Sequence, residues 1–289
     1  MINICTVGDK KYLLKGLALY QSLCKTAEGK FLLHWLCIDK ETYDILFALK
    51  INNIILYNLS WYEERYPVLQ QAKNNPASSY GDQYSQYCWS LTPWFINHLL
   101  SVHKYDTVIY ADTDVYFYNS PYCIVDAMQN RSVAIHTHRF SGLYRQNIDT
   151  GWYNVGVMVF KAMPPGLTIS KTWADWVLTT GHEFYKSHGT CGDQKYLELF
   201  IPKFGEQNVL VFDEQAGICH KAPWCTEDCA GDQQTLFYHF SHFIFDLDKN
   251  TWQDSWNSEW NPSGNPAIKE KYYDPYFEAI KQSQKMIHG

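Results

Sequence analysis

Apolar and polar residues follow one another at the start of the chain in a pattern that predicts alternating strands and helices. Unbroken apolar runs predict buried strands, and apolar side chains recurring about every 3.6 residues predict helices between them. The expected strands are residues 2–7, 31–38 and 54–57, and the expected helices are residues 12–24 and 42–50. This alternation predicts a parallel sheet with right-handed crossovers.

A fourth buried strand, residues 107–110, leads directly into Asp112 and Asp114. Burying two carboxylates costs free energy that a bound divalent cation offsets, and hard oxygen ligands suit Mg²⁺ or Mn²⁺. The other interpretation is a surface turn with two solvated aspartates. Asp9 and Asp39 also follow predicted strands. Because ligands of parallel sheets bind beyond the carboxyl ends of the strands, we expect these three loops to converge on one crevice.

The rest of the chain is more polar between its predicted elements. Residues 63–84 are interpreted as a long loop or lid, and residues 139–150 as a second polar, mobile segment. Residues 86–103 predict a helix with Pro93 in its first turns. Further strands are expected at residues 153–160, 209–212 and 237–240, and further helices at residues 173–179, 193–200 and 268–287.

Composition narrows the class of protein. The 289 residues suffice for one large domain or two closely joined ones, and a net charge of −6 argues against a nucleic-acid partner. Nine cysteines form no regular framework, the chain starts as a strand, and no apolar stretch is long enough to span a bilayer. We therefore expect a reduced, cytoplasmic protein, with peripheral membrane association as the alternative.

Two further clusters have competing interpretations. Cys219, His220, Cys225 and Cys229 have a loosely zinc-like spacing, but free thiols are the favoured interpretation. Trp252, Trp256 and Trp260 recur every four residues, and we favour packing over a sugar platform.

Ordered motifs then give the chain a family resemblance. The motifs are residues 4–9 with Tyr12, the strand and acids of residues 105–114, the Asn-Val-Gly-Val run in residues 153–160, residues 192–194, and residues 239–240. Together they resemble the GT-A-fold, nucleotide-sugar-dependent glycosyltransferases, in the group that includes glycogenin and the lipopolysaccharide galactosyltransferases, over roughly residues 2–242. The resemblance implies a Rossmann-like α/β fold, with a mostly parallel central sheet flanked by helices. It also implies a single domain over residues 1–289, with a nucleotide-binding part at about 1–120 and an acceptor-side part at about 121–289.

The resemblance also implies a metal site. Asp112, Asp114 and His239 would hold one Mn²⁺ or Mg²⁺ that grips the donor diphosphate, and an imidazole ligand favours Mn²⁺. Without the resemblance, His239 is interpreted as a packed core histidine between two aromatic residues.

Nucleotide contacts follow from the same resemblance. The backbone of Thr6 and Val7 would meet the nucleoside, Asp9 would accept a hydrogen bond from the base, and Tyr12 would stack on it. Asp112 and Thr113 would also contact the nucleotide. Asp9 could equally cap the helix that follows it, and Asp39 could contact ribose or cap its own helix.

Sugar contacts are expected from Asn154, Gly156, Asp193 and Gln194, and the last two are the catalytic candidates. A glycine within a buried strand indicates close approach of a ligand, whereas Asn154 could instead be satisfied by neighbouring backbone. Asp193 could also be a helix cap. By resemblance we expect retention of the anomeric configuration; an inverting enzyme would use Asp193 as its general base.

The expected activity is transfer of a sugar from a nucleotide-diphosphate donor, UDP being favoured, to a hydroxyl of a glycan, glycolipid or protein. Two departures from the family mark a divergent member. The glycine and the diphosphate-binding lysine that follow the histidine ligand in the family are missing here, and His242 or Lys249 would substitute. In the helix before residues 107–114, Ser90 and Thr92 stand where the family has a basic residue. The alternatives are a sugar nucleotidyltransferase, a non-catalytic carbohydrate-binding protein and, more weakly, a glycosidase.

Overall fold

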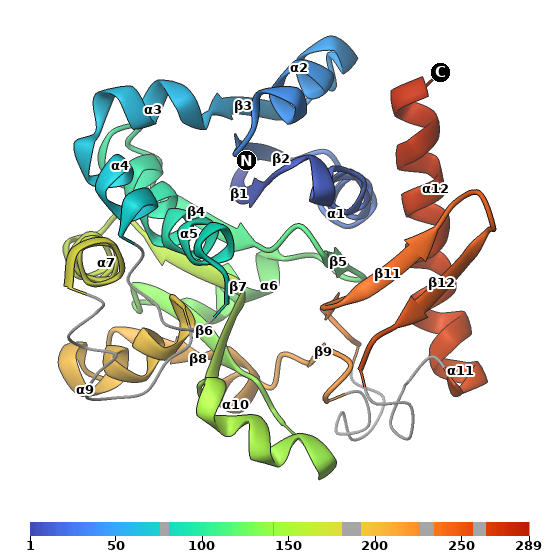
Figure 1. The fold of residues 1–289 in the computed structure, drawn as a ribbon. Coiled ribbons are helices and arrows are strands. Elements are labelled where there is room, and N and C mark those ends of the chain that lie inside the picture. The colour runs from blue at the N-terminus through green and yellow to red at the C-terminus, as the bar shows by residue number, and fades with distance from the viewer. Residues whose placement is uncertain (76–80, 141, 181–191, 226–233, 257–263, 289) are drawn as a thin grey trace.

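A seven-stranded sheet forms the centre of the computed structural model, which describes residues 1–75, 81–140, 142–180, 192–225, 234–256 and 264–288 (Figure 1). Its strands, in spatial order, are β3 (Ile54–Asn58), β2 (Phe31–Cys37), β1 (Ile2–Gly8), β4 (Thr107–Ala111), β7 (Tyr153–Lys161), β6 (Val133–Thr137) and β8 (Val209–Val211). Only β7 runs antiparallel to its two neighbours. The predicted mostly parallel α/β fold is confirmed.

The middle of this sheet is a topological switch point. From β1 the chain builds β2 and β3 on one side, then returns to β4 on the other side of β1. The β1–β4 pair is parallel, with Cys5 opposite Tyr110. Crevices of this kind, beyond the carboxyl ends of the strands, are where ligands bind in open α/β sheets.

Helices cover both faces of the sheet because successive strand side chains point to opposite faces. Val108 and Tyr110 pack into one core with Leu91 and Phe95, whereas Ile109 packs into the other. The helices of the first core are α3 (Leu59–Arg65), α4 (Pro67–Asn74), α5 (Gln83–Ser101), α7 (Pro164–Asp175) and α9 (Phe200–Phe204), and those of the second are α1 (Leu13–Thr26), α2 (Lys40–Leu49), α6 (Tyr122–Met128) and α10 (Phe212–Gln215).

A smaller sheet and an aromatic cluster lie beside the main sheet. The strands β5 (Val115–Phe117), β10 (Phe237–His239) and β9 (His220–Lys221) form a three-stranded sheet, and β11 (Phe243–Asp246) pairs with β12 (Thr251–Asp254). The C-terminal helix α12 (Asp274–His288) follows α11 (Pro266–Ile268) and the π-helical turn η6 (Lys269–Tyr273), and it packs beside α1 (Figure 1). Stacked rings such as Phe240 on Tyr276, with centroids 3.8 Å apart, join these parts.

The structure corrects several sequence-based predictions. Much of residues 63–84 is helical, since α3 and α4 bury Leu59 and Leu69 and expose their other faces, which made the segment look like a loop. Pro93 lies inside α5, which begins ten residues earlier at Gln83 and is capped by the Asp82 side chain. Residues 142–150 form the 3₁₀ helix η2 (Gly142–Thr150).

Other expected elements are found with shifted bounds. Residues 173–179 span the end of α7 and the π-helical turn η3 (Trp176–Thr180), and residues 193–200 contain the 3₁₀ helix η4 (Gln194–Leu199). The expected helix at residues 268–287 is interrupted by η6. The short elements β5, β6, β9, β11, β12 and α6 were not predicted.

The cysteine and tryptophan clusters are only partly covered by the described residues. Cys219 is disulfide-bonded, which corrects the free-thiol interpretation for that residue, and Cys229 and Trp260 lie outside the described residues. Trp256 packs against Trp224 with ring centroids 5.0 Å apart, as the packing interpretation predicts. In the described part of the chain, no helix combines the length and apolar character needed to cross a membrane.

Candidate active site

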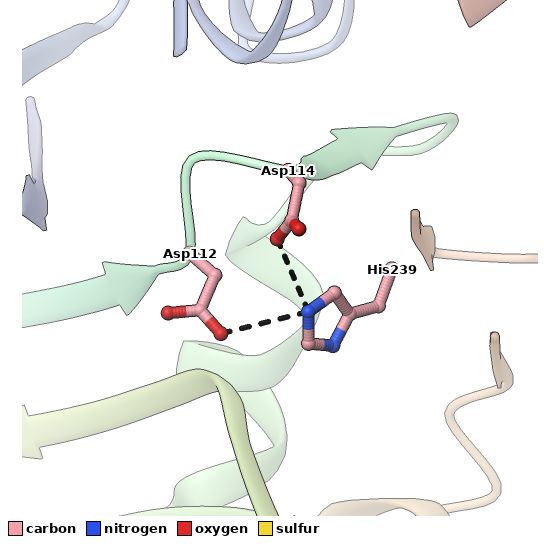
Figure 2. Close-up of side chains that lie close together, drawn as sticks. All are labelled: Asp112, Asp114 and His239. Atoms are coloured by element: carbon pink, nitrogen blue, oxygen red, sulfur yellow. Dashed lines mark ion pairs between the residues drawn. The ribbon is translucent and has the colours of Figure 1, made fainter. Parts of the chain in front are cut away.

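Three side chains expected to bind a metal converge beyond the carboxyl end of β4. Asp112 and Asp114 stand in the turn between β4 and β5, and His239 ends β10 (Figure 2). The antiparallel pairing of β10 with β5 places His239 opposite Val115, and so beside the two acids. The Nε2 atom of His239 lies 3.1 Å from Oδ1 of Asp114 and 3.6 Å from Oδ2 of Asp112.

Hydrogen bonds fix this turn from several elements. The amide of Asp112 donates to the carbonyl of Gly156 in β7 at 2.9 Å, and the amide of Phe240 donates to the carbonyl of Asp114 at 2.8 Å. A side-chain hydrogen bond adds to these, in which the Tyr110 hydroxyl donates to Oδ1 of Asp112 at 2.7 Å. The turn is therefore held by the main sheet on one side and by the smaller sheet on the other.

The charges of the cluster influence one another strongly. Burial raises the pKa of Asp112 to about 6, with a further contribution from the Asp114 carboxylate. Burial also opposes ionisation of Asp114, but His239 and Lys15 outweigh it and hold the pKa of Asp114 at about 2. The pKa of His239 is raised overall, because the two carboxylates outweigh the lowering that burial causes. Positive charge is thus favoured at the point between these side chains.

The donor set of this cluster fits a divalent cation. One ligand atom from each of Asp112, Asp114 and His239 can be chosen so that all lie within 4.8 Å of one another. Carboxylate oxygens and an imidazole nitrogen are suitable ligands for Mn²⁺ and related ions. The Nε2 atom of His239 is the candidate ligand atom, because it faces both carboxylates. Its Nδ1 atom is buried and has no hydrogen-bond partner among the described residues.

Gly156 makes room for this histidine. A Cβ atom at Gly156 would lie 2.7 Å from Nδ1 of His239 and 2.7 Å from Oδ1 of Asn154. The sequence predicted the close approach of a ligand at this glycine, which stays a prediction. Among the described residues, the approaching groups are these two side chains.

The loop after β1, which is expected to bind the nucleoside, lies next to residues 112–114, here called the acidic turn. A Cβ atom at Gly8 would lie 2.8 Å from Cγ2 of Thr113, so the missing side chain allows the two loops to touch. Burial and the carboxylates of Asp114, Asp112 and Asp9 raise the pKa of Tyr12 to about 12. Tyr12 nevertheless remains 39% exposed, so its ring is accessible for stacking. Two of the three predicted loops, those of Gly8 and Thr113, therefore touch.

Asp9 is a helix cap, as one of its two interpretations predicted. Its Oδ1 accepts a hydrogen bond from the amide of Tyr12 at 3.2 Å, at the start of the 3₁₀ helix η1 (Lys10–Tyr12). Its Oδ2 accepts from the hydroxyl of Tyr84 at 2.8 Å. An ionised carboxylate has about four lone-pair sites, so a contact with a base remains available. Tyr84 was missed because its segment was interpreted as a loop.

Asp39 is likewise a cap and also joins the first two loops. Its Oδ1 accepts from the amide of Thr42 at 2.7 Å at the start of α2, and its Oδ2 accepts from the amide of Lys10 at 2.7 Å. The side chain of Thr6 is fully buried, and its hydroxyl has no hydrogen-bond partner among the described residues.

The predicted sugar-binding residues form one network on the opposite side of the acidic turn. The Asn154 side-chain amide donates to Nε2 of His138 at 3.0 Å and to Oε1 of Gln194 at 3.3 Å, and its carbonyl oxygen accepts from the amide of Gly156 at 2.8 Å. Gln194 in turn donates to the carbonyl of Thr150 at 2.9 Å. His138 was not predicted, because it lies outside the predicted elements and motifs.

Asp193 is buried and lies within electrostatic reach of Asp112, one of the three candidate metal ligands. Its side chain is 3% exposed, and burial together with the charge of Asp112 raises its pKa. It makes no side-chain cap hydrogen bond at the start of η4, so the cap interpretation is not observed. Lys15 is a further charged residue that sequence reasoning missed, since it was counted only as part of the first helix.

The sheet order, the switch point and the acidic turn define the fold class: the chain has the fold of the GT-A glycosyltransferases. The structure of galactosyltransferase LgtC in complex with donor and acceptor sugar analogues is similar, with a TM-score of 0.62 and 11% identity over 97% of this chain and 96% of that chain. Mouse xyloside xylosyltransferase 1, in its apo form, gives a TM-score of 0.55 and 16% identity over 82% of this chain and 97% of that chain.

Two proteins with similar sequences are both described as uncharacterized. The chain is 26% identical to YfnD of Bacillus subtilis strain 168, an uncharacterized protein, over 86% of this chain and 79% of YfnD. It is 28% identical to the uncharacterized YfnF of the same strain, over 69% of this chain and 65% of YfnF. No protein-family model matches the chain.

Proposed function

We propose that this chain is a metal-dependent glycosyltransferase that moves a sugar from a nucleotide-diphosphate donor, with UDP as the favoured nucleotide, to a hydroxyl of a glycan, glycolipid or protein. The observation that carries this proposal is the convergence of Asp112, Asp114 and His239 at the switch point of a GT-A fold. A binding site for one cation at that point suits a substrate whose two phosphates are themselves anionic.

The residues of this chain have separate tasks in the proposal. Asp112, Asp114 and His239 would hold Mn²⁺ or Mg²⁺. When bound, the cation supplies Lewis-acid stabilisation of the charge that develops on the departing diphosphate. Tyr12 and Asp9 bind the nucleoside, supported by the accessible ring of Tyr12 beside the acidic turn.

The nucleotide-binding task extends to the residues around β1 and the turn. The backbone of Thr6 and Val7 and the side chain of Thr113 line the nucleoside, supported by the contact of Thr113 with Gly8. The proposed metal site takes two ligands from the part before residue 121 and one from the part after it. Both proposed parts of the domain therefore contribute to donor binding.

Asn154, Gly156, Asp193 and Gln194 form the proposed sugar side of the site. The network from Thr150 through Gln194 to Asn154 holds two amide side chains in fixed orientations, which suits recognition of sugar hydroxyls. Asp193 and Gln194 act next to the reacting carbon, with retention of configuration as the proposed outcome. The cytoplasmic location, with or without attachment to a membrane surface, stays a prediction.

A thermal-shift screen tests the proposal. The purified chain is heated with UDP-glucose, UDP-galactose, UDP-N-acetylglucosamine or UDP-xylose, with and without Mn²⁺, because a ligand that binds only the folded state raises the melting temperature. We expect at least one donor to stabilise the wild type only when Mn²⁺ is present. The variant Asp114→Asn should lose this effect. Asp126→Asn, the same change at an exposed position of α6, should keep it.

A second measurement separates the rival activities. With the stabilising donor, release of UDP is measured with and without candidate acceptors. UDP release supports transfer, whereas donor binding without turnover indicates a carbohydrate-binding protein. Formation of pyrophosphate from a nucleoside triphosphate and a sugar phosphate indicates a nucleotidyltransferase. If no nucleotide sugar shifts the melting temperature in the presence of Mn²⁺, the proposal is wrong.

A further inference from the structure

The first helix packs against the strand that follows the acidic turn, and it carries a buried lysine. Lys15, in α1, is 8% exposed, and α1 packs against β5, which directly follows Asp114 (Figure 1). Its ammonium nitrogen lies 5.1 Å from the ring centroid of Tyr12. Burial lowers the pKa of Lys15 and the Asp114 carboxylate partly offsets this, so the ammonium lies within electrostatic reach of that carboxylate.

Among the residues that the structure describes, the ammonium of Lys15 has no direct anionic partner. Within the described part of the chain, it makes neither a hydrogen bond nor an ion pair within 4.0 Å. A buried charge without such a partner is costly, and proteins normally pair it or use it to bind a ligand. Lys15 therefore has the features of a residue that binds an anion: it is basic, buried and, among the described residues, without a hydrogen-bonded or ion-paired carboxylate.

The basic residues expected to fulfil this role lie elsewhere. Lys249 is exposed and its ammonium pairs with Asp246 at 2.8 Å, in the turn between β11 and β12. His242 is exposed and packs edge-on against Trp256, with ring centroids 5.8 Å apart. Neither side chain shows the burial or the electrostatic contact with Asp114 that Lys15 shows.

We propose that Lys15 binds the diphosphate group of the nucleotide donor, an inference that rests on the proposed function. Lys15 contacts Tyr12 on the proposed nucleoside side and interacts by charge with Asp114 on the proposed metal side, and the phosphates of such a donor would lie between those two sides. A lysine ammonium is a compact point charge that binds phosphate oxygens without requiring one fixed geometry. Lys15 thereby replaces, from the first helix, the lysine that this chain lacks after His239.

The competing role for Lys15 is structural: it could only balance the charge of Asp114. The two roles predict opposite effects on the metal. If Lys15 binds the diphosphate, its removal weakens UDP binding but strengthens binding of Mn²⁺ alone, because a positive charge near Asp114 is lost. If Lys15 only holds Asp114 in place, its removal disturbs the turn and weakens both.

Calorimetric titration with UDP in the presence of saturating Mn²⁺, and titration with Mn²⁺ alone followed by electron paramagnetic resonance, test the proposal. Lys15→Met, which keeps the aliphatic stem, should weaken UDP binding about tenfold or more, as expected for loss of one hydrogen bond from a charged group. It should also bind Mn²⁺ alone at least as tightly as the wild type does. Lys15→Arg, which keeps the charge, should retain more UDP affinity than Lys15→Met.

The matched control is Lys11→Met, which removes the same charge from a neighbouring but exposed position in η1. We expect it to change UDP affinity less than about threefold, as for a screened surface charge. Equal losses in the two Met variants, or weaker binding of both UDP and Mn²⁺ in Lys15→Met, would overturn the assignment of Lys15. If Lys15→Met does not fold, the comparison of Lys15→Arg with Lys15→Gln decides in the same way.

The failure of this inference is distinguishable from failure of the proposed function. A wild-type chain that binds no UDP in the presence of Mn²⁺ contradicts the proposed donor, and the role of Lys15 with it. If the wild type binds UDP and Lys15→Met binds it equally tightly, only the proposed role of Lys15 is contradicted.

Discussion

Gly156 and His239 are packed so closely that only a glycine fits: an added Cβ atom would lie 2.7 Å from Nδ1 of the imidazole. Gly156→Ala is therefore expected to push the His239 ring away from Asp112 and Asp114. Since catalytic and metal sites tolerate little displacement, we expect Mn²⁺ affinity to fall about tenfold or more. Titration with Mn²⁺ followed by electron paramagnetic resonance measures this change.

The control for this prediction is another glycine with free space around it. A Cβ atom at Gly264 would have no atom within 4 Å, so Gly264→Ala should leave Mn²⁺ affinity unchanged. A Gly156→Ala protein that binds Mn²⁺ as the wild type does would show that His239 is not a ligand.

Removal of a carboxylate from the acidic turn should stabilise the metal-free protein. Burial raises the pKa of Asp112, which means that its charged form costs folding free energy at neutral pH. Asp112→Asn keeps an oxygen that can accept the Tyr110 hydrogen bond. We expect the free energy of unfolding of the metal-free chain to rise by roughly 1 kcal/mol, the amount often gained when a functional charge is removed.

Urea denaturation with a chelator present measures this gain, and repetition with excess Mn²⁺ provides the contrast. The wild type should be stabilised by Mn²⁺, whereas Asp112→Asn should not, because the ligand is gone. If Mn²⁺ stabilises both proteins equally, Asp112 does not bind the metal.

Gln194 is predicted to affect turnover rather than donor affinity. Its side chain joins Asn154 to the carbonyl of Thr150 and lies on the proposed sugar side of the turn, not on the nucleoside side. We expect Gln194→Ala to lower the rate of sugar transfer about tenfold to a hundredfold, as for loss of a positioning hydrogen bond. Single-turnover kinetics and donor titration separate the two effects. The exposed Gln253 in β12 supplies the control variant Gln253→Ala, which should match the wild type.

The packing of Gly16 against Trp35 gives a prediction about stability. A Cβ atom at Gly16, in α1, would lie 2.1 Å from Cη2 of the fully buried Trp35. Gly16→Ala gains up to about 1 kcal/mol of helix propensity but overpacks the core, which typically costs about 1–3 kcal/mol. We therefore expect a net loss of stability in urea denaturation.

A double-mutant cycle identifies the cause. In a Trp35→Phe background the smaller ring relieves the contact, so Gly16→Ala should cost less there than in the wild type. An equal cost in both backgrounds would mean that the loss does not come from the Gly16–Trp35 contact.

His34 should make the protein less stable in mild acid. It is fully buried, with Nδ1 3.0 Å from the Tyr57 hydroxyl, and burial, with a smaller contribution from His103, lowers its pKa to about 4. In the unfolded chain His34 binds a proton below a pH of about 6.5, whereas in the folded chain it stays neutral down to a pH of about 4. Stability is complete above that pH and falls as the pH decreases toward 4.

Between pH 7.5 and 5, we expect this one residue to lower the free energy of unfolding by about 2 kcal/mol. Urea denaturation at several pH values measures the slope. His34→Gln should show a smaller loss over the same range, whereas replacement of the exposed His288 by Gln should not change the slope. Identical slopes for wild type and His34→Gln contradict the prediction.

The first half of the sheet was predictable because its pattern is local. The strands β1, β2, β3 and β4 are apolar runs separated by helices with regular spacing, so each element is visible within its own residues. Short elements such as β9, with two residues, carry no local pattern and exist because β10 pairs beside them. The helices α3 and α4 were mistaken for a loop because only one side of each is apolar.

The sequence by itself determined the α/β fold, the position of Asp112 and Asp114 beyond a buried strand, and the spacing of Asn154 and Gly156. These depend on neighbouring residues in the chain. No local pattern placed His239 near the two acids, although the family resemblance implied it. The tertiary structure brings it there, 125 residues after Asp114, through pairing of β10 with β5. It alone also brought Lys15 within electrostatic reach of Asp114, because contacts between distant segments follow from packing and strand register, which no local pattern of residues specifies.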